Sequence, residues 1–295
     1  MPPMSGKPTD QSGASPVAAP QIFNAKRVAL RQKRAARRRA RRHEPQFLLA
    51  RIAEDIAERL LMINRRFEKA LLIAPDDFEG ILQPYIHPEK HPQSLITSPL
   101  QKLGPTLREH SGFDLIISVM AHHNENDPQG LFKALKTHMV DDGHIMTVCL
   151  GGDSFSQLRQ SLYAADQSQF GGVAPRFHPV MDIKKNAQLL AHCGFSLTMG
   201  DRDRLTVHYK QLSTLIGDIR DLGESYALTA KSSSHTSREY WKQAAQIYKA
   251  EHSENERLIA HFDVLWASGW TPHHSQQKPL KPGSSQVHIS EIFKP

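Results

Sequence analysis

The sequence predicts an α/β fold built on a mostly parallel central sheet, and three observations carry this prediction. Residues 113–120 (FDLIISVM) and 144–150 (HIMTVCL) are apolar at consecutive positions, as expected of strands buried on both faces. Between them, residues 130–139 (GLFKALKTHM) have helical spacing, and a crossover of that length returns the chain parallel. Residues 258–268 alternate apolar and polar side chains, which indicates an antiparallel strand near the C-terminus.

The positive charge of the chain is concentrated at its N-terminus. The 295 residues carry a net charge of +7, yet residues 1–43 alone contain 11 Lys and Arg against one acid, Asp10. Residues 1–20 are rich in Pro, Ser, Gly and Ala, which predicts a disordered tail. Residues 21–43 predict a basic, partly helical arm, either solvated or docked on its own domain. Binding to a polyanion or an anionic lipid and organelle targeting are alternatives, although no aromatic residues are interleaved with the arginines for base stacking, which argues against a nucleic-acid partner.

The remaining chain predicts one domain over residues 44–290, followed by a short tail at 291–295. An apolar stripe at spacings of three and four predicts a helix over 45–67. Residues 69–74 and 94–100 predict the first two strands, and the DDG at 141–143 predicts a turn before the strand at 144. The predicted core of the sheet is Leu72, Ile73, Leu115, Ile116, Ile117, Ile145, Thr147 and Val148.

The second half of the domain predicts four helices and further strands. Asp153 or Ser154 is expected to cap a helix over 154–167, because a side-chain oxygen there can accept from the free amides of the first turn. A helix over 182–193 should end at Gly194. Residues 195–200 and 204–209 predict two strands or one long bent strand. Helices are predicted over 211–223 and 238–252, the second with Trp241, Ala245 and Tyr248 on one face.

Other classes of site are not favoured by the sequence. No apolar stretch approaches the ~20 residues that span a bilayer. His87 and His91 are four residues apart, but Pro88 and Pro92 interrupt the helix on which they could share a metal, so a surface loop is expected and no metal site is predicted. Two cysteines do not make a disulfide framework, and both are expected to be buried thiols.

Several segments together resemble one known family. FDLIIS, GGDSFSQLR, PRFHPVMDI, LLAHCGF, DRLTVHY and GWTPHHSQQKPLKPGS occur in this order between residues 21 and 290. They resemble the class I S-adenosylmethionine-dependent methyltransferase-like proteins, in the group of the complex I assembly factor that hydroxylates an arginine of an iron-sulfur subunit, with its bacterial relatives. The resemblance implies a Rossmann-like class I methyltransferase fold and makes S-adenosylmethionine the cofactor to consider.

By position, the resemblance places Ala74, Asp76, Thr97 and Met120 at the cofactor site. The chain departs from the family there, because the first strand runs into Pro75 instead of a glycine-rich loop and no acid ends the second strand. We therefore expect a degenerate cofactor site with poor affinity for S-adenosylmethionine. His122 and His123 follow the next strand and are the candidate catalytic residues, although a histidine at a strand end is more often a polar cap.

The resemblance implies a protein partner, a respiratory complex I (NADH dehydrogenase) subunit that the chain modifies or assembles. The polar residues Gln276, Gln277 and Lys278 are the candidate partner contacts, because such a segment does not bury apolar surface. Two alternatives stay open: an active methyltransferase acting on a small molecule, carrier protein or side chain, and an RNA-associated module using the basic arm. The expected location is the cytoplasm in a bacterium and the mitochondrial matrix in a eukaryote.

Overall fold

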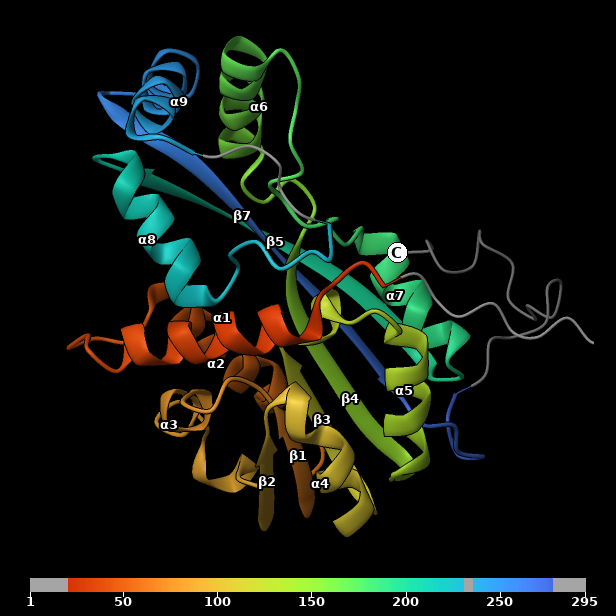
Figure 1. The fold of residues 1–295 in the computed structure, drawn as a ribbon. Helices are drawn as coiled ribbons and strands as arrows, with labels where there is room; N and C mark the ends of the chain where they lie inside the picture. The colour runs from red at the N-terminus through yellow and green to blue at the C-terminus, as the bar shows by residue number, and fades with distance from the viewer. Residues whose placement is uncertain (1–20, 231–235, 278–295) are drawn as a thin grey trace, which may run out of the picture.

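A computed structural model describes residues 21–230 and 236–277, which form a twisted sheet with helices on both faces (Figure 1). The strand order is β2-β1-β3-β4-β7-β5, with the short β6 paired to β7. The strands are β1 Lys69–Ile73, β2 Ser94–Ser98, β3 Phe113–Val119, β4 Met139–Gly151, β5 Ser196–Tyr209, β6 Ser253–Glu254 and β7 Arg257–Trp270. The helices are α1 Ala25–Arg39, α2 Phe47–Met62, α3 Phe78–Leu82, α4 Leu103–Glu109, α5 Pro128–Thr137, α6 Ser156–Phe170, α7 Ile183–His192, α8 Leu212–Leu222 and α9 Arg238–Glu251, with 3₁₀ turns η1 Pro88–Lys90, η2 Leu100–Lys102 and η3 His122–Asn124.

The pairing of the strands confirms the predicted fold class. β2, β1, β3 and β4 are parallel, and β7 runs antiparallel between β4 and β5. The two strand-like segments predicted over 195–209 are one long strand, β5, at the edge of the sheet. Among the described residues, no helix is both long and apolar enough to span a bilayer.

Two hydrophobic clusters, one on each face, explain why the central strands are apolar at consecutive positions. Along β3, Leu115 and Ile117 pack in one cluster with α2, α6, α8 and α9, while Ile116 packs in the other with α5 and α7. Strands covered on both sides have no solvated face to carry polar residues. All eight residues of the predicted core are buried, with exposed fractions of 3% or less.

The turn predicted at residues 141–143 is wrong, because β4 runs through these residues without interruption. Asp142 adopts a left-handed φ of 57°, and the pairing of β4 with β3 shifts register between Phe113 and Leu115. The Gly143 amide donates to Thr271 Oγ1 at 2.7 Å. The same residues that predict a turn therefore form a bulge in a strand paired on both sides.

Two further predictions need correction. Neither Asp153 nor Ser154 caps α6 with its side chain: α6 follows Phe155, which has a left-handed φ of 57° and no side-chain cap. Both side chains are used by contacts with the neighbouring strands. On α9 the buried residues are Tyr240, Ala244 and Tyr248. Tyr248 was predicted, but Tyr240 and Ala244 each precede by one position the predicted Trp241 and Ala245. Helical spacing fixes a stripe only to within one residue when aromatic residues are adjacent.

The basic arm is docked on the domain. α1 crosses beside α8 above the carboxyl ends of the first strands (Figure 1). Arg38 and Arg42 form ion pairs with Asp221, and Arg42 is also 3.0 Å from Asp218. The acidic face of α8 thus relieves the mutual repulsion of the arginines on α1.

Candidate functional site

Two cavities lie at the carboxyl ends of the parallel strands, where ligands of such sheets bind. The first, here the α1 cavity, measures about 510 Å³ and lies between α1 and the segments that follow β1, β2 and β3. The second, here the α8 cavity, measures about 420 Å³ and lies between α6, α8 and the loop at 175–180. The 3₁₀ turn η3 contributes to both, since Asn124 lines the first and His123 the second.

The α1 cavity brings together three of the four residues assigned to the cofactor by position. Ala74, Asp76 and Met120 line it, and Met120 is a non-glycine residue with a left-handed φ of 52°. Thr97 is absent from its lining, and its hydroxyl instead donates to Glu79 Oε2 at 2.7 Å. Backbone strain of this kind is often found at functional sites, and here it lies at the end of β3.

The lining of the α1 cavity fits S-adenosylmethionine poorly. The cofactor has a sulfonium, an ammonium and a carboxylate group, a net charge of +1, whereas the cavity lining combines the cations Lys33, Arg37, Arg39 and Lys102 with one acid, Asp76. Beside the cavity, both oxygens of Asp77 accept from Arg39, at 2.5 and 2.7 Å. Pro75 offers no backbone donor, and β2 ends at a serine rather than an acid.

The α8 cavity is walled mainly by apolar side chains from three elements. Leu158 and Leu162 of α6, Ile216 and Ile219 of α8, and Phe177 of the loop line it. Ligand pockets commonly combine such walls with a few convergent polar groups.

A buried polar cluster lies at one end of this cavity, formed by Arg31, His123, Asn124, His178 and Glu224. His123 Nε2 lies 3.2 Å from Glu224 Oε2, and both side chains are only 6% exposed. The Ala227 amide donates to His178 Nε2 at 3.0 Å, and Arg31 Nη1 donates to the Ser225 carbonyl at 2.7 Å. The members come from α1, η3, the 175–180 loop and the segment after α8, so only the tertiary structure assembles them.

Glu224 is ionised in this cluster. Burial alone would raise its pKa, but His123 and Arg31 outweigh that effect and lower the pKa to about 2. Burial and the charge of Arg31 lower the pKa of His178 to about 4. The cluster therefore contains an ionised carboxylate and a neutral imidazole near neutral pH, and the Nδ1 atom of His123 is buried without a hydrogen-bond partner in the described chain.

The two candidate catalytic histidines have different surroundings. His122 is fully buried, lines neither cavity, and has Nε2 at 3.0 Å from Asn186 Oδ1. Burial lowers its pKa to about 3, so it is a neutral packing residue beside Phe132. His123 lines the α8 cavity, but its Nε2 lies 3.2 Å from Glu224 and 2.9 Å from Asn124 Nδ2 while its Nδ1 is buried, so its catalytic role stays a prediction.

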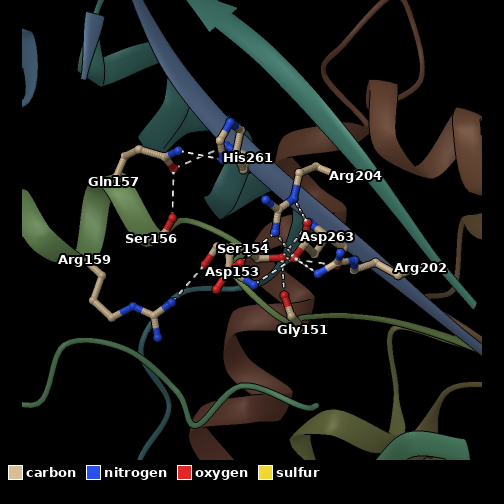
Figure 2. A network of polar contacts seen from close by, with 10 residues as sticks. All are labelled: Gly151, Asp153, Ser154, Ser156, Gln157, Arg159, Arg202, Arg204, His261 and Asp263. Atoms are coloured by element: carbon tan, nitrogen blue, oxygen red, sulfur yellow. Dashed lines mark hydrogen bonds and ion pairs between the residues drawn. The ribbon is translucent and has the colours of Figure 1, made fainter. Parts of the chain in front are cut away.

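The GGDSFSQLR segment that carried the family resemblance forms the turn between β4 and α6, and Asp263 of β7 holds it (Figure 2). Asp263 accepts from the Asp153 amide at 2.8 Å and from Arg204 Nε at 2.6 Å, while its own amide donates to Ser154 Oγ at 2.8 Å. Gly152 has a left-handed φ of 54°, and a Cβ there would lie 2.4 Å from the Asp263 carboxylate. The network fixes Ser154 and the following residues, which line the α8 cavity.

The candidate partner residues lie far along the chain from this turn. Gln276 Nε2 donates to Asp142 Oδ1 and to the Thr271 carbonyl, both at 2.8 Å, so this side chain binds the bulge of β4. Gln277 is exposed, and Lys278 lies outside the described residues. Among the residues that the structure describes, no group of three His, Cys, Asp or Glu side chains is placed to hold a metal.

Several residues of the site were not singled out from the sequence. Glu224 and Arg31 have no local signal, because each is a charged residue next to a helix end or within a basic run. His178 lies in the quoted PRFHPVMDI segment, and Asp263 is the polar residue in the middle of an apolar strand. A buried charge in a strand could have marked Asp263, since such residues are rarely buried unless paired.

Comparison with known proteins gives relatives named as arginine-hydroxylases and as methyltransferases. The chain is 33% identical over 186 residues to the mitochondrial arginine-hydroxylase NDUFAF5 of Dictyostelium discoideum, covering 62% of this chain and 42% of that protein. It is 29% identical over 184 residues to the human protein of the same name, covering 62% and 53%. A malonyl-[acyl-carrier protein] O-methyltransferase of Xylella fastidiosa is 24% identical over 216 residues, covering 72% and 70%. The chain spans about half the length of the arginine-hydroxylases it matches.

No protein-family model matches the chain. Among solved structures, the YcgJ protein of Bacillus subtilis aligns with a TM-score of 0.45 at 10% identity, over 76% of this chain and 99% of that chain. The strand order and pairing described above establish the Rossmann-like arrangement from the structure itself. With that fold and these homologues, the resemblance of this chain to the class I methyltransferase-like proteins of the NDUFAF5 arginine-hydroxylase group is confirmed.

Proposed function

We propose that this protein acts on, or helps to assemble, a subunit of respiratory complex I, and that it does not transfer methyl groups from S-adenosylmethionine. The similarity to the NDUFAF5 arginine-hydroxylases over 62% of the chain carries this proposal. The location that goes with it is the mitochondrial matrix in a eukaryote and the cytoplasm in a bacterium.

The degenerate cofactor site rests on electrostatics and backbone chemistry. A charge-assisted hydrogen bond to the ribose contributes roughly 1.5–3 kcal/mol, which corresponds to about ten- to hundredfold in affinity. The position for that bond, after Ser98, carries no carboxylate. The cations that α1 places beside the cavity weaken the binding of a positively charged ligand further.

An active methyltransferase is the second candidate. The relationship to a malonyl-[acyl-carrier protein] O-methyltransferase and the size of the α1 cavity favour it. The RNA-associated alternative has less support, because Arg38, Arg39 and Arg42 of the basic arm already form ion pairs with carboxylates of the domain.

Isothermal titration calorimetry with S-adenosylmethionine separates the first two candidates. We expect no heat of binding at micromolar cofactor for the unaltered chain. A Pro75→Gly variant restores a backbone donor but leaves the ribose position and the cationic wall unchanged, so its gain should be small. Micromolar binding by the unaltered chain would reject the degenerate site and place the active methyltransferase first.

The partner is tested by co-purification of a tagged chain with subunits of complex I from the organism's own membranes. Because the Gln276 side chain donates hydrogen bonds within its own domain, Gln276 is changed in one variant, and Gln277 and Lys278 are changed in another. Gln277→Ala with Lys278→Ala should reduce recovery of the partner without changing the melting temperature. Gln276→Ala is the matched variant for a structural role, and equal recovery in all three proteins would remove this segment from the partner contact.

A further inference from the structure

The lining of the α8 cavity includes charged residues that no carboxylate in the described part of the chain neutralises. Of the three arginines that line it, Arg176 is paired with Asp166 and lies 4.6 Å from the Tyr240 ring. Arg159 and Arg220 form no ion pair with any carboxylate among residues 21–230 and 236–277. They come from α6 and α8, on two sides of the cavity.

Glu224, the carboxylate that lines the cavity, already has positively charged or hydrogen-bonding neighbours. Glu224 faces His123 at 3.2 Å, and Arg31 of the same buried cluster adds a further positive charge near it. The lining as a whole is therefore electropositive, with one compensated carboxylate and two arginines left over.

The contacts of Arg159 support a role in binding a ligand in this cavity. Its Nη2 lies 3.4 Å from the Ser154 carbonyl (Figure 2). Its guanidinium carbon lies 5.8 Å from the centre of the Phe177 ring. Those contacts leave most of its five N–H donors free for a ligand. Arg220 is exposed and follows Ile219 and Ile216, which form part of the apolar wall.

We propose that the α8 cavity binds an amphipathic anion, with an aliphatic chain between α6 and α8 and a carboxylate held by Arg159 and Arg220. Apolar walls together with two unpaired arginines complement such a ligand in both charge and polarity. An arginine or lysine side chain is disfavoured in the same place, because two unmatched guanidinium groups would repel it. This ligand site goes beyond the proposed role with a protein partner and does not depend on the state of the α1 cavity.

Calorimetry with four ligands that share one ten-carbon chain tests the proposal. Decanoate should bind, decan-1-ol should bind more weakly, and decyltrimethylammonium should not bind. Decyl phosphate separates two sources of the anion: equal or weaker binding than decanoate supports the carboxylate, and much tighter binding replaces it by a phosphate head group. Shortening decanoate by one methylene should weaken binding by up to about fourfold, because each buried methylene contributes in proportion to its area.

Three variants locate the site. Arg159→Gln and Arg220→Gln should each weaken decanoate binding by about three- to tenfold and leave decan-1-ol unchanged. Ile216→Trp, at a half-buried position on the wall, should block both ligands. Arg108→Gln on α4 is the matched control, since Arg108 is exposed and lies away from the cavity.

The outcomes are separable from those of the cofactor test, which probes the other cavity. If decanoate and decyltrimethylammonium bind alike, or if Arg159→Gln and Arg220→Gln both behave as Arg108→Gln does, the anion site is rejected. A melting temperature within a few degrees of the unaltered chain shows that each variant is folded, so that lost binding cannot be ascribed to unfolding.

Discussion

At the scale of single residues, Asp263 stabilises the turn between β4 and α6 through several polar contacts. Its side chain is fully buried in β7, and it holds the turn after β4 together with Arg204. Burial alone would raise its pKa, yet the hydrogen bonds from Arg204 and the Asp153 amide lower it. The ionised, buried carboxylate and its three donors therefore stabilise this turn, in which Gly152 and Phe155 both have a left-handed φ.

We expect Asp263→Asn to destabilise the fold by about 2–4 kcal/mol, because it leaves Arg204 beside a neutral group and turns one acceptor into a donor. Urea denaturation followed by circular dichroism measures this loss. Asp141→Asn, an exposed acid on the neighbouring strand, is the control and should stay within about 0.5 kcal/mol. Equal losses in the two variants would show that the turn does not depend on the buried carboxylate.

At the scale of elements, the docking of α1 on α8 determines how the carboxyl edge of the sheet is covered. Asp221 is 1% exposed and accepts from Arg38 and Arg42, while the Asp221 carbonyl accepts from Arg39 at 2.5 Å. α1 has few apolar residues facing the domain, with Val28 and Ala35 buried. Ion pairs and hydrogen bonds therefore hold the helix, which makes its attachment sensitive to salt.

We expect Asp221→Asn to loosen α1 while the sheet stays intact. Hydrogen–deuterium exchange of the α1 amides should accelerate by about tenfold or more, and high salt should produce the same effect in the unaltered chain. Glu239→Gln, which removes an exposed acid from α9, is the matched control. Deletion of residues 1–20, predicted from composition to be disordered, should change neither the exchange nor the melting temperature. Slow exchange of α1 in Asp221→Asn would show that packing rather than charge holds the helix.

At the scale of the whole molecule, buried neutral histidines make the fold sensitive to acid. Burial lowers the pKa of His122 to about 3 and that of His144 to about 4, and His178 is lowered to about 4 by burial and Arg31. In the unfolded chain the histidine pKa is about 6.5. Between pH 6.5 and the lowered pKa values of the folded state, the unfolded chain therefore binds more protons than the folded one. The free energy of unfolding is therefore not reduced by these histidines above pH 6.5, and it decreases as the pH falls toward 4.

Thermal unfolding as a function of pH checks this expectation. Each of the three histidines should cost about 1–2 kcal/mol at pH 5, so the melting temperature should fall by several degrees between pH 7 and pH 5. His122→Gln keeps an acceptor and donor for Asn186 and removes the titrating ring, so its profile should be flatter. His192→Gln on the exposed face of α7 should leave the slope unchanged. A profile without slope from pH 7 to pH 5 would contradict the burial of neutral imidazoles.

The sequence by itself determined the class of the fold, because burial on both faces of the sheet leaves apolar residues at consecutive positions, as at Leu115, Ile116 and Ile117. The family resemblance placed Ala74, Asp76, Thr97 and Met120 at one site; the structure brings Ala74, Asp76 and Met120 to one cavity, whereas Thr97 donates to Glu79 instead. Only the tertiary structure decided that DDG forms a bulge inside β4 instead of a turn before it, and that Asp153 faces Arg204 instead of capping α6. It alone joined Arg31, His123, His178 and Glu224, because charge pairing between residues distant in the chain leaves no periodic pattern along the sequence.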